Sequence, residues 1–136
     1  HVIPAIIKKV YEAKLNKKNE IIIWGDGSPT REFLYVDDAA EGILLAASKY
    51  NGESPLNLGS GIEISIGDLT KKICGIMEYG GNIAFDTSKP NGQLKRRLDI
   101  SKAALLLGFQ ATTEIDDGLR KTINWFVNSR SIPIDI

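Results

Sequence analysis

The chain has 136 residues, of which 43% are hydrophobic and 25% are charged, and its 17 basic side chains balance 17 acidic ones. This length suits one domain or a piece of a larger one, and the composition is that of a globular chain rather than a disordered one. The zero net charge argues against a protein that binds a nucleic-acid backbone over a long tract, which requires a basic excess. The apolar runs are also far shorter than the roughly 20 residues that a membrane span needs.

The sequence holds one cysteine, Cys74, and one histidine, His1. A single cysteine excludes an internal disulfide, fits a reducing compartment and cannot form a thiolate zinc site alone, so we predict a cytoplasmic, metal-free chain. The chain begins with His1 rather than Met and continues directly into a helical pattern. We interpret residues 1–136 as the C-terminal part of a longer protein.

The predicted elements alternate between helices and short strands. The spacing of Ile3, Ile7 and Val10 predicts a helix, and Ser65 to Asp68 has the pattern of a capping box at a helix start. In chain order we first expect a helix over 2–14, a buried strand over 20–24, a strand over 31–36 and a helix over 37–49. A brief strand over 55–58, a helix over 66–79, a strand over 82–85 and a polar loop over 86–97 are expected next. Ser101 then caps a short helix that ends near Gly108, and a second capping box at 113–116 begins the last helix. This is an α/β unit with too few strands for a complete doubly wound fold.

Residues that could form a complete catalytic centre are missing from the sequence. It contains no G-x-G-x-x-G or Walker loop, and none of its four tyrosines has a lysine four positions later. His1 has no recognisable triad partners, and Cys74 lies in the middle of an amphipathic helix, which favours simple packing. We therefore predict that the isolated chain binds a ligand but is inactive as an enzyme.

Three features predict a ligand that carries both a ring and phosphate. Trp24 ends a strand before a glycine-rich turn, where an indole can pack on a planar base. Arg31 follows that turn, and its planar fork suits a pyrophosphate or sugar hydroxyls. The loop over 86–97 adds four basic side chains. The alternatives are that Trp24 belongs to the core, that the loop is a solvated surface, and that Arg31 pairs with a neighbouring carboxylate (Glu32, Asp37 or Asp38).

Four segments give the chain a recognisable family resemblance. Residues 31–38 read REFLYVDD and residues 57–61 read NLGSG, while residues 1–5 read HVIPA and residues 86–90 read DTSKP. With these segments the chain resembles, from residue 1 to residue 126, the C-terminal part of the extended short-chain dehydrogenase/reductases that act on nucleotide sugars. The resemblance implies a Rossmann-type α/β fold, of which residues 1–136 form the substrate-binding portion and the NADP-binding part is absent.

The resemblance also implies roles for individual residues. The family's histidine lies near the nicotinamide and acts as an acid in epimerisation, so His1 is the expected catalytic and cofactor-contacting residue. The expected substrate-binding residues are Lys9, Trp24, Arg31, Asn91 and Arg96. Asn91 stands where many members have an aspartate, so it keeps an acceptor and loses a charge.

The branch most similar to this chain epimerises C3 and C5 and reduces C4 of GDP-4-keto-6-deoxy-D-mannose with NADPH, which gives GDP-L-fucose. The resemblance therefore implies a GDP-sugar substrate, NADP bound mainly by the absent part, and a homodimer of the full-length protein. Two other hypotheses stay open at this point: another nucleotide-sugar epimerase or dehydratase, and a non-catalytic relative that binds nucleotide. A nucleic-acid module is disfavoured by the zero net charge and by the lack of aromatic residues among the basic ones of the 86–97 loop.

Overall fold

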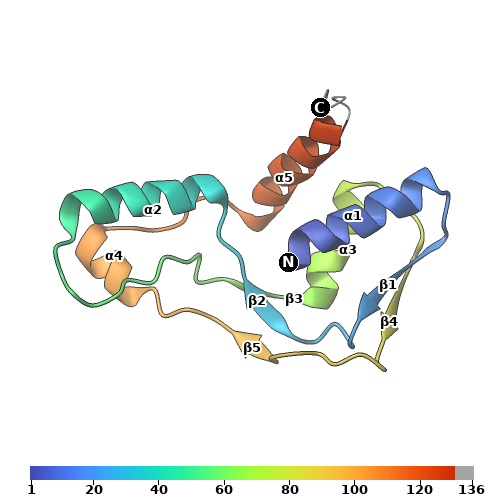
Figure 1. Ribbon diagram of the computed structural model, residues 1–136, viewed down its shortest axis with the longest axis horizontal. Helices are drawn as coiled ribbons and strands as arrows, with labels where there is room; N and C mark the ends of the chain where they lie inside the picture. The colour runs from blue at the N-terminus through green and yellow to red at the C-terminus, as the bar shows by residue number, and fades with distance from the viewer. Residues whose placement is uncertain (131–136) are drawn as a thin grey trace, which may run out of the picture.

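The computed structural model describes residues 1–130, and it alternates helices with short strands (Figure 1). Among these residues no helix is long and apolar enough to cross a membrane. The elements are α1 (Val2–Leu15), β1 (Glu20–Trp24), β2 (Thr30–Glu32), α2 (Val36–Lys49), β3 (Glu63–Ser65), α3 (Ile66–Ile76), β4 (Asn82–Asp86), β5 (Lys95–Arg96), α4 (Ser101–Leu107) and α5 (Ile115–Arg130).

The strands of the described region form two small sheets. β1 pairs with β4 in parallel, from Glu20 opposite Asn82 to Trp24 opposite Asp86. β2 lies between β3, which is antiparallel to it, and β5, which is parallel to it. The parallel partner of β1 therefore comes from a segment about 60 residues later. The chain that follows β4 then runs alongside β2, where it forms β5.

The main core lies between β1 and three helices. Every second residue of β1 points into it, so Ile21 and Ile23 are buried while Ile22 is 50% exposed. The sequence predicts a buried strand here, and this is wrong for one face, because helices cover β1 on the other face only. The buried members of this core are Ile6, Ile7, Val10 and Ala13 of α1, Ile21 and Ile23, Leu69, Ile73, Cys74 and Met77 in and after α3, and Leu119 and Ile123 of α5.

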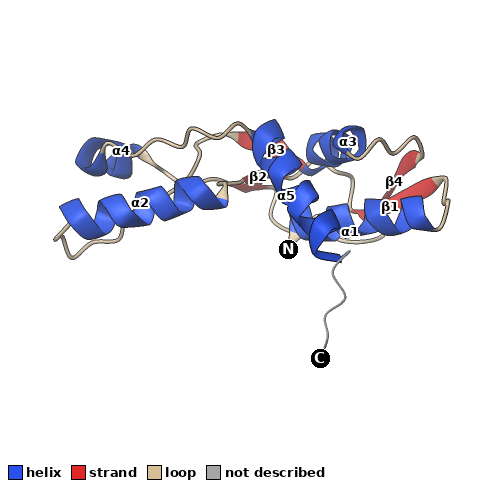
Figure 2. Ribbon diagram, turned by 90° about the horizontal axis from the view of Figure 1, so that it is seen from above, coloured by secondary structure: helices blue, strands red, loops and turns tan. Residues whose placement is uncertain are grey.

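A second, smaller core joins α2 to α4. Ala103, Leu107 and Phe109 are buried there, and they pack against Leu45 and Ala46 of α2. Figure 2 shows α2 and α4 at one end of the molecule, with α1, α3, β1 and β4 at the other. The sheet of β3, β2 and β5 lies between the two ends. The pairing of these strands therefore positions the loops that run from one core to the other.

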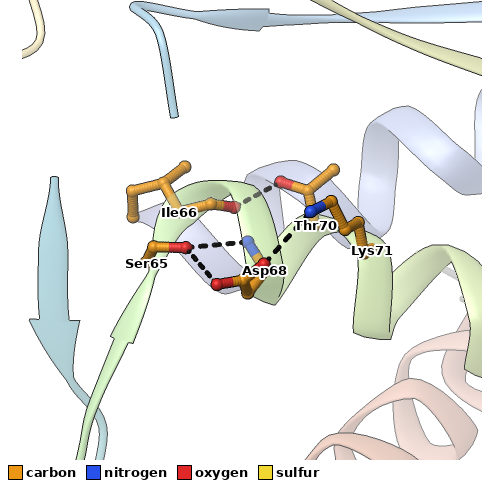
Figure 3. Close-up of polar contacts among 5 residues, drawn as sticks. All are labelled: Ser65, Ile66, Asp68, Thr70 and Lys71. Atoms are coloured by element: carbon orange, nitrogen blue, oxygen red, sulfur yellow. Dashed lines mark hydrogen bonds and ion pairs between the residues drawn. The ribbon is translucent and has the colours of Figure 1, made fainter. Parts of the chain in front are cut away.

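The start of α3 is fixed by the predicted capping box. The Ser65 hydroxyl accepts a hydrogen bond from the Asp68 backbone N–H at 3.0 Å and donates one to the Asp68 carboxylate at 2.8 Å (Figure 3). Asp68 also forms an ion pair with Lys71, one turn later. These bonds satisfy a backbone donor that the helix itself cannot, and they end β3 at Ser65.

Several predicted boundaries are corrected by the structure. The predicted strand over 31–36 is shorter, since β2 ends at Glu32 and Val36 already belongs to α2. Residues 55–58, which were predicted as a strand, form none. The loop over 86–97 contains a strand, β5, which has no local apolar pattern and exists because β2 offers it a partner. The helix α3 ends at Ile76 rather than near residue 79, since Glu78 adopts a left-handed φ of 51° and the Tyr79 N–H bonds back to the Cys74 carbonyl.

Two predicted helix caps are also wrong. The residue before α4 is Ile100, and the Asp99 carboxylate accepts from both the N–H and the hydroxyl of Ser101. The second capping box fails because α5 begins at Ile115, two residues after Thr113. Thr113 instead directs its backbone N–H to the Asp38 carboxylate, 75 residues earlier in the chain.

Asp38 joins α2 to the segment before α5. Its side chain is 4% exposed and accepts hydrogen bonds from the Thr112 N–H, the Thr112 hydroxyl and the Thr113 N–H at 3.1–3.3 Å. Burial raises the pKa of Asp38, but these hydrogen bonds outweigh it and hold the pKa below its ordinary value. The ionised carboxylate therefore stabilises the fold above the unfolded pKa, and this stabilisation is lost as the pH falls through the folded pKa.

Asp38→Asn is expected to lower the free energy of unfolding at pH 7 by about 1.5–3 kcal/mol, the usual range for hydrogen bonds to a charged group. Urea titrations of both proteins at several pH values measure this. The difference between them should shrink as the pH falls below about 4, because the wild-type carboxylate then becomes protonated. A difference that does not depend on pH would contradict the assigned role of the charge.

Candidate functional site

The candidate site begins with the turn between β1 and β2. Gly25 and Gly27 have φ values of +80° and +79°, which residues with a Cβ rarely adopt, and the Asp26 carboxylate accepts from the Ser28 N–H at 2.8 Å. Trp24 lies just before this turn and is 66% exposed. The alternative that Trp24 belongs to the core is therefore wrong, and its indole is available to a ligand.

The loop after β4 is fastened to this turn through Asn91. The Asn91 Oδ1 accepts from the Asp26 N–H at 2.8 Å, and a Cβ on Gly25 would lie 2.2 Å from that oxygen. Hydrogen bonds from Ser28, with a smaller contribution from Asn91, lower the pKa of Asp26. An aspartate at position 91 could accept from the same N–H, but it would place a second carboxylate beside Asp26. Asn91 therefore fixes the loop to the turn with an uncharged acceptor.

Arg31 connects β2 to the same loop. Its Nη1 donates to the backbone carbonyls of Thr30 and Gln93, both at 2.7 Å. Within residues 1–130 it forms no ion pair, since the acidic side chains of Glu32 and Asp38 accept from backbone N–H groups instead. The alternative that Arg31 pairs with a neighbouring carboxylate is therefore wrong for these two residues. Its guanidinium is held in place by carbonyls, which leaves its positive charge uncompensated.

Arg96 lies directly beside Arg31 in the second sheet. The parallel register of β2 and β5 places Arg31 opposite Arg96 and Thr30 opposite Lys95. Arg96 is exposed, whereas the Lys95 ammonium forms an ion pair with Glu63 at 3.1 Å. The hydrogen bond from Lys95, followed by one from Thr30, lowers the pKa of Glu63. Of the two cations on β5, Arg96 is thus the one free of an ion pair in the described part of the chain.

The remaining predicted residues lie on α1. The Lys9 ammonium donates to the Ile22 carbonyl of β1 at 2.6 Å, two residues before Trp24. His1 is exposed at the start of α1, and its carbonyl accepts from the Ala5 N–H. The structure therefore joins Asn91 to the turn that follows Trp24 and sets Arg31 opposite Arg96, and Lys9 bonds to the strand that leads to this turn. Among the described residues it gives His1 no side-chain contact with this group.

The sequence analysis did not find the large cavity of the molecule. It has a volume of about 850 Å³, within the range of ligand pockets, and lies between the β2–α2 connection, β3 and α5. Its wall is mainly apolar, with Phe33, Ile62, Ile64 and Trp125 among its residues, and it includes none of the six predicted site residues. The sequence signal for this cavity is the run of apolar residues at positions 33–36, which we interpreted as part of a strand.

Cys74 lies away from the candidate site, in the main core of the described residues. It is buried in the main core, and burial raises the pKa of its thiol, which disfavours the reactive thiolate. The prediction that it serves packing agrees with this position.

Comparison with known proteins shows what this chain is similar to. Residues 1–59 match the model of the NAD dependent epimerase/dehydratase family. Over 95% of its length the chain is 39% identical to the GDP-L-fucose synthase of Sinorhizobium fredii and 36% identical to GDP-L-fucose synthase 1 of Arabidopsis thaliana. Over nearly its whole length the chain is thus similar to a part of these two GDP-L-fucose synthases.

The same relationship is seen in three dimensions. A crystal structure of a GDP-L-fucose synthetase from Naegleria fowleri bound to NADP matches 96% of the chain with a TM-score of 0.90 at 34% identity. This confirms the predicted family resemblance and the Rossmann-type fold class. The chain spans about 40% of the length of these relatives, 41% of the Sinorhizobium protein and 41% of the Naegleria structure. The roles of the six site residues stay predictions. So does the assignment of residues 1–136 to the substrate-binding part of a longer enzyme.

Proposed function

We propose that this chain is the C-terminal, substrate-binding part of an NADP-dependent enzyme of the GDP-L-fucose synthase type. Such an enzyme epimerises C3 and C5 and reduces C4 of GDP-4-keto-6-deoxy-D-mannose to give GDP-L-fucose. The observations that carry the proposal are that the Trp24 indole, at the end of β1, is exposed and that the parallel register of β2 and β5 sets Arg31 opposite Arg96. Its similarity to GDP-L-fucose synthases over 95% of the chain supports the choice of substrate.

The geometry suits the base and the diphosphate of a nucleoside diphosphate sugar. A planar base can pack on the indole, and arginine forks bind phosphate oxygens with two parallel hydrogen bonds. Because carbonyls already hold the Arg31 guanidinium, less conformational entropy is lost when a ligand binds. Lys9 and Asn91 complete the proposed site, Lys9 beside β1 and Asn91 by fixing the loop.

NADP supplies the hydride in this chemistry, and most of its site must be sought outside residues 1–136. The sequence has no glycine-rich loop of the kind that holds a pyrophosphate, and it has no Tyr-x-x-x-Lys pair. Within this chain His1 is the residue proposed to lie beside the nicotinamide and to move a proton at the sugar. The 136-residue chain alone should therefore not oxidise NADPH.

The other parts of the proposal concern the setting of the complete enzyme. We propose that it is a cytoplasmic homodimer that binds no nucleic acid and no membrane. The single buried cysteine and the zero net charge support this setting.

GDP is expected to change the tryptophan fluorescence of the intact protein, because the base would pack on the exposed indole of Trp24. Trp24→Phe should remove the change. Trp125→Phe is the matched control, since Trp125 is similarly exposed at 69% but lies on α5, and it should leave the change intact.

UDP serves as the comparison ligand in the same titration. Stronger binding of GDP than of UDP supports the fucose-synthase type, and stronger binding of UDP would favour another nucleotide-sugar epimerase. If a folded intact protein binds neither nucleotide, the proposed function is wrong.

A further inference from the structure

Glu32, the last residue of β2, accepts hydrogen bonds from the segment before β3 and from the segment after β5. Its Oε1 accepts from the Gly61 N–H and its Oε2 accepts from the Leu98 N–H, each at 2.9 Å. Gly61 lies two residues before β3, and Leu98 lies two residues after β5. One carboxylate therefore joins three chain segments that are 29 and 66 residues apart in sequence.

These two bonds continue ladders that are otherwise very short. β2 and β3 pair over three residues and end with Glu32 opposite Glu63, while β2 and β5 pair over two residues and end with Arg31 opposite Arg96. A ladder of two residues has few backbone hydrogen bonds to fix its register. The Glu32 carboxylate supplies one further acceptor beyond this end of each ladder, while the Leu94 carbonyl accepts from the Thr30 N–H at the other end of the β2–β5 pairing.

The space for this carboxylate depends on Gly59. A Cβ at Gly59 would lie 2.1 Å from the Glu32 Oε1 and 3.0 Å from the Ile100 Cγ2. Gly59 has no positive φ, so an alanine there would act by displacing the Glu32 carboxylate rather than by straining the backbone. Glu32 forms no ion pair within residues 1–130. Its carboxylate accepts hydrogen bonds from the Gly61 and Leu98 backbone N–H groups instead.

We propose that Glu32 is a positioning residue for substrate binding: its carboxylate holds the strand that carries Arg96 in register with Arg31. This inference rests on the proposed function, because it takes both arginines to bind the diphosphate of a GDP-sugar. Glu32 itself contacts no ligand. Its part is to keep the two cations next to each other, so that they bind the same diphosphate.

The test measures the affinity of the intact protein for GDP and for guanosine, which lacks the diphosphate. Glu32→Gln replaces one of the two acceptors by a donor, and we expect GDP to bind about tenfold more weakly while the affinity for guanosine stays the same. Asp38→Asn is the matched control, since it removes the charge from another carboxylate that accepts from two backbone N–H groups. It should lower stability without changing either affinity.

A second variant pair tests the contact with Gly59. Gly59→Ala should weaken GDP binding in the wild type, because the new methyl group displaces the carboxylate. In a Glu32→Ala background the same change should add little, since the oxygen it meets is gone. Equal and additive effects of the two changes would overturn the inference.

The outcomes separate this inference from the proposed function. If the wild type binds GDP and Glu32→Gln binds it equally well, the positioning role is wrong and the proposed function stands. If Glu32→Gln loses GDP and guanosine affinity alike, Glu32 serves the fold and not the two arginines, and the inference again fails. If the wild type binds neither ligand, both the proposed function and the inference are wrong.

Discussion

Arg31→Ala is expected to weaken the binding of GDP by about 1.5–3 kcal/mol, which is roughly 10- to 150-fold in Kd. The variant loses a cation that within residues 1–130 no carboxylate neutralises, together with the bond from its Nη1 to the Gln93 carbonyl. Arg31→Lys should recover only part of the affinity, because an ammonium cannot reproduce the planar fork. Calorimetric titration with GDP measures all three proteins.

Arg97→Ala is the matched control for this prediction. It makes the same change in charge one residue beyond β5, at an exposed side chain outside the proposed site, and should leave the affinity close to that of the wild type. Thermal unfolding of each variant separates ligand binding from stability. An Arg31→Ala protein that melts early and still binds GDP with native affinity would refute the role of Arg31 as a ligand.

His1→Ala is expected to slow epimerisation by about 10²–10⁴-fold in the longer enzyme proposed above, the usual contribution of a positioned acid. The rate of deuterium incorporation at C3 and C5 of GDP-4-keto-6-deoxy-D-mannose in D₂O measures this step apart from hydride transfer. The affinity for NADPH should change far less, because the cofactor is held mainly outside this chain.

Two outcomes decide the role of His1. Slow exchange with near-native NADPH binding supports an acid at this position. Unchanged exchange in the variant would remove His1 from the mechanism. Such a result would be compatible with the described residues, in which no hydrogen bond orients the His1 side chain toward the candidate site.

Local sequence patterns predicted the helices and most of the strands. The apolar spacing over residues 2–14 gave α1 within one residue, and the Ser65–Asp68 pattern gave the start of α3 with its cap bond in place. These features depend on residues that are close in sequence, so periodicity and capping chemistry are sufficient to find them. The motifs that carry the family resemblance were visible in the same way.

Only the tertiary structure decided which of the predicted site residues meet. The pairing of β2 with β5, the bond from Arg31 to Gln93 and the bond from Asp26 to Asn91 each join segments more than 60 residues apart. No local pattern marks Lys95–Arg96 as a strand or Glu32 as an acceptor for two flanking segments, because backbone N–H groups are common to every sequence and their partners are set by topology. The sequence by itself determined the family resemblance and the residue types available at the proposed site. The long-range pairing joined the turn after Trp24 to Asn91 and set Arg31 opposite Arg96, and no hydrogen bond among the described residues joins the His1 side chain to any of them.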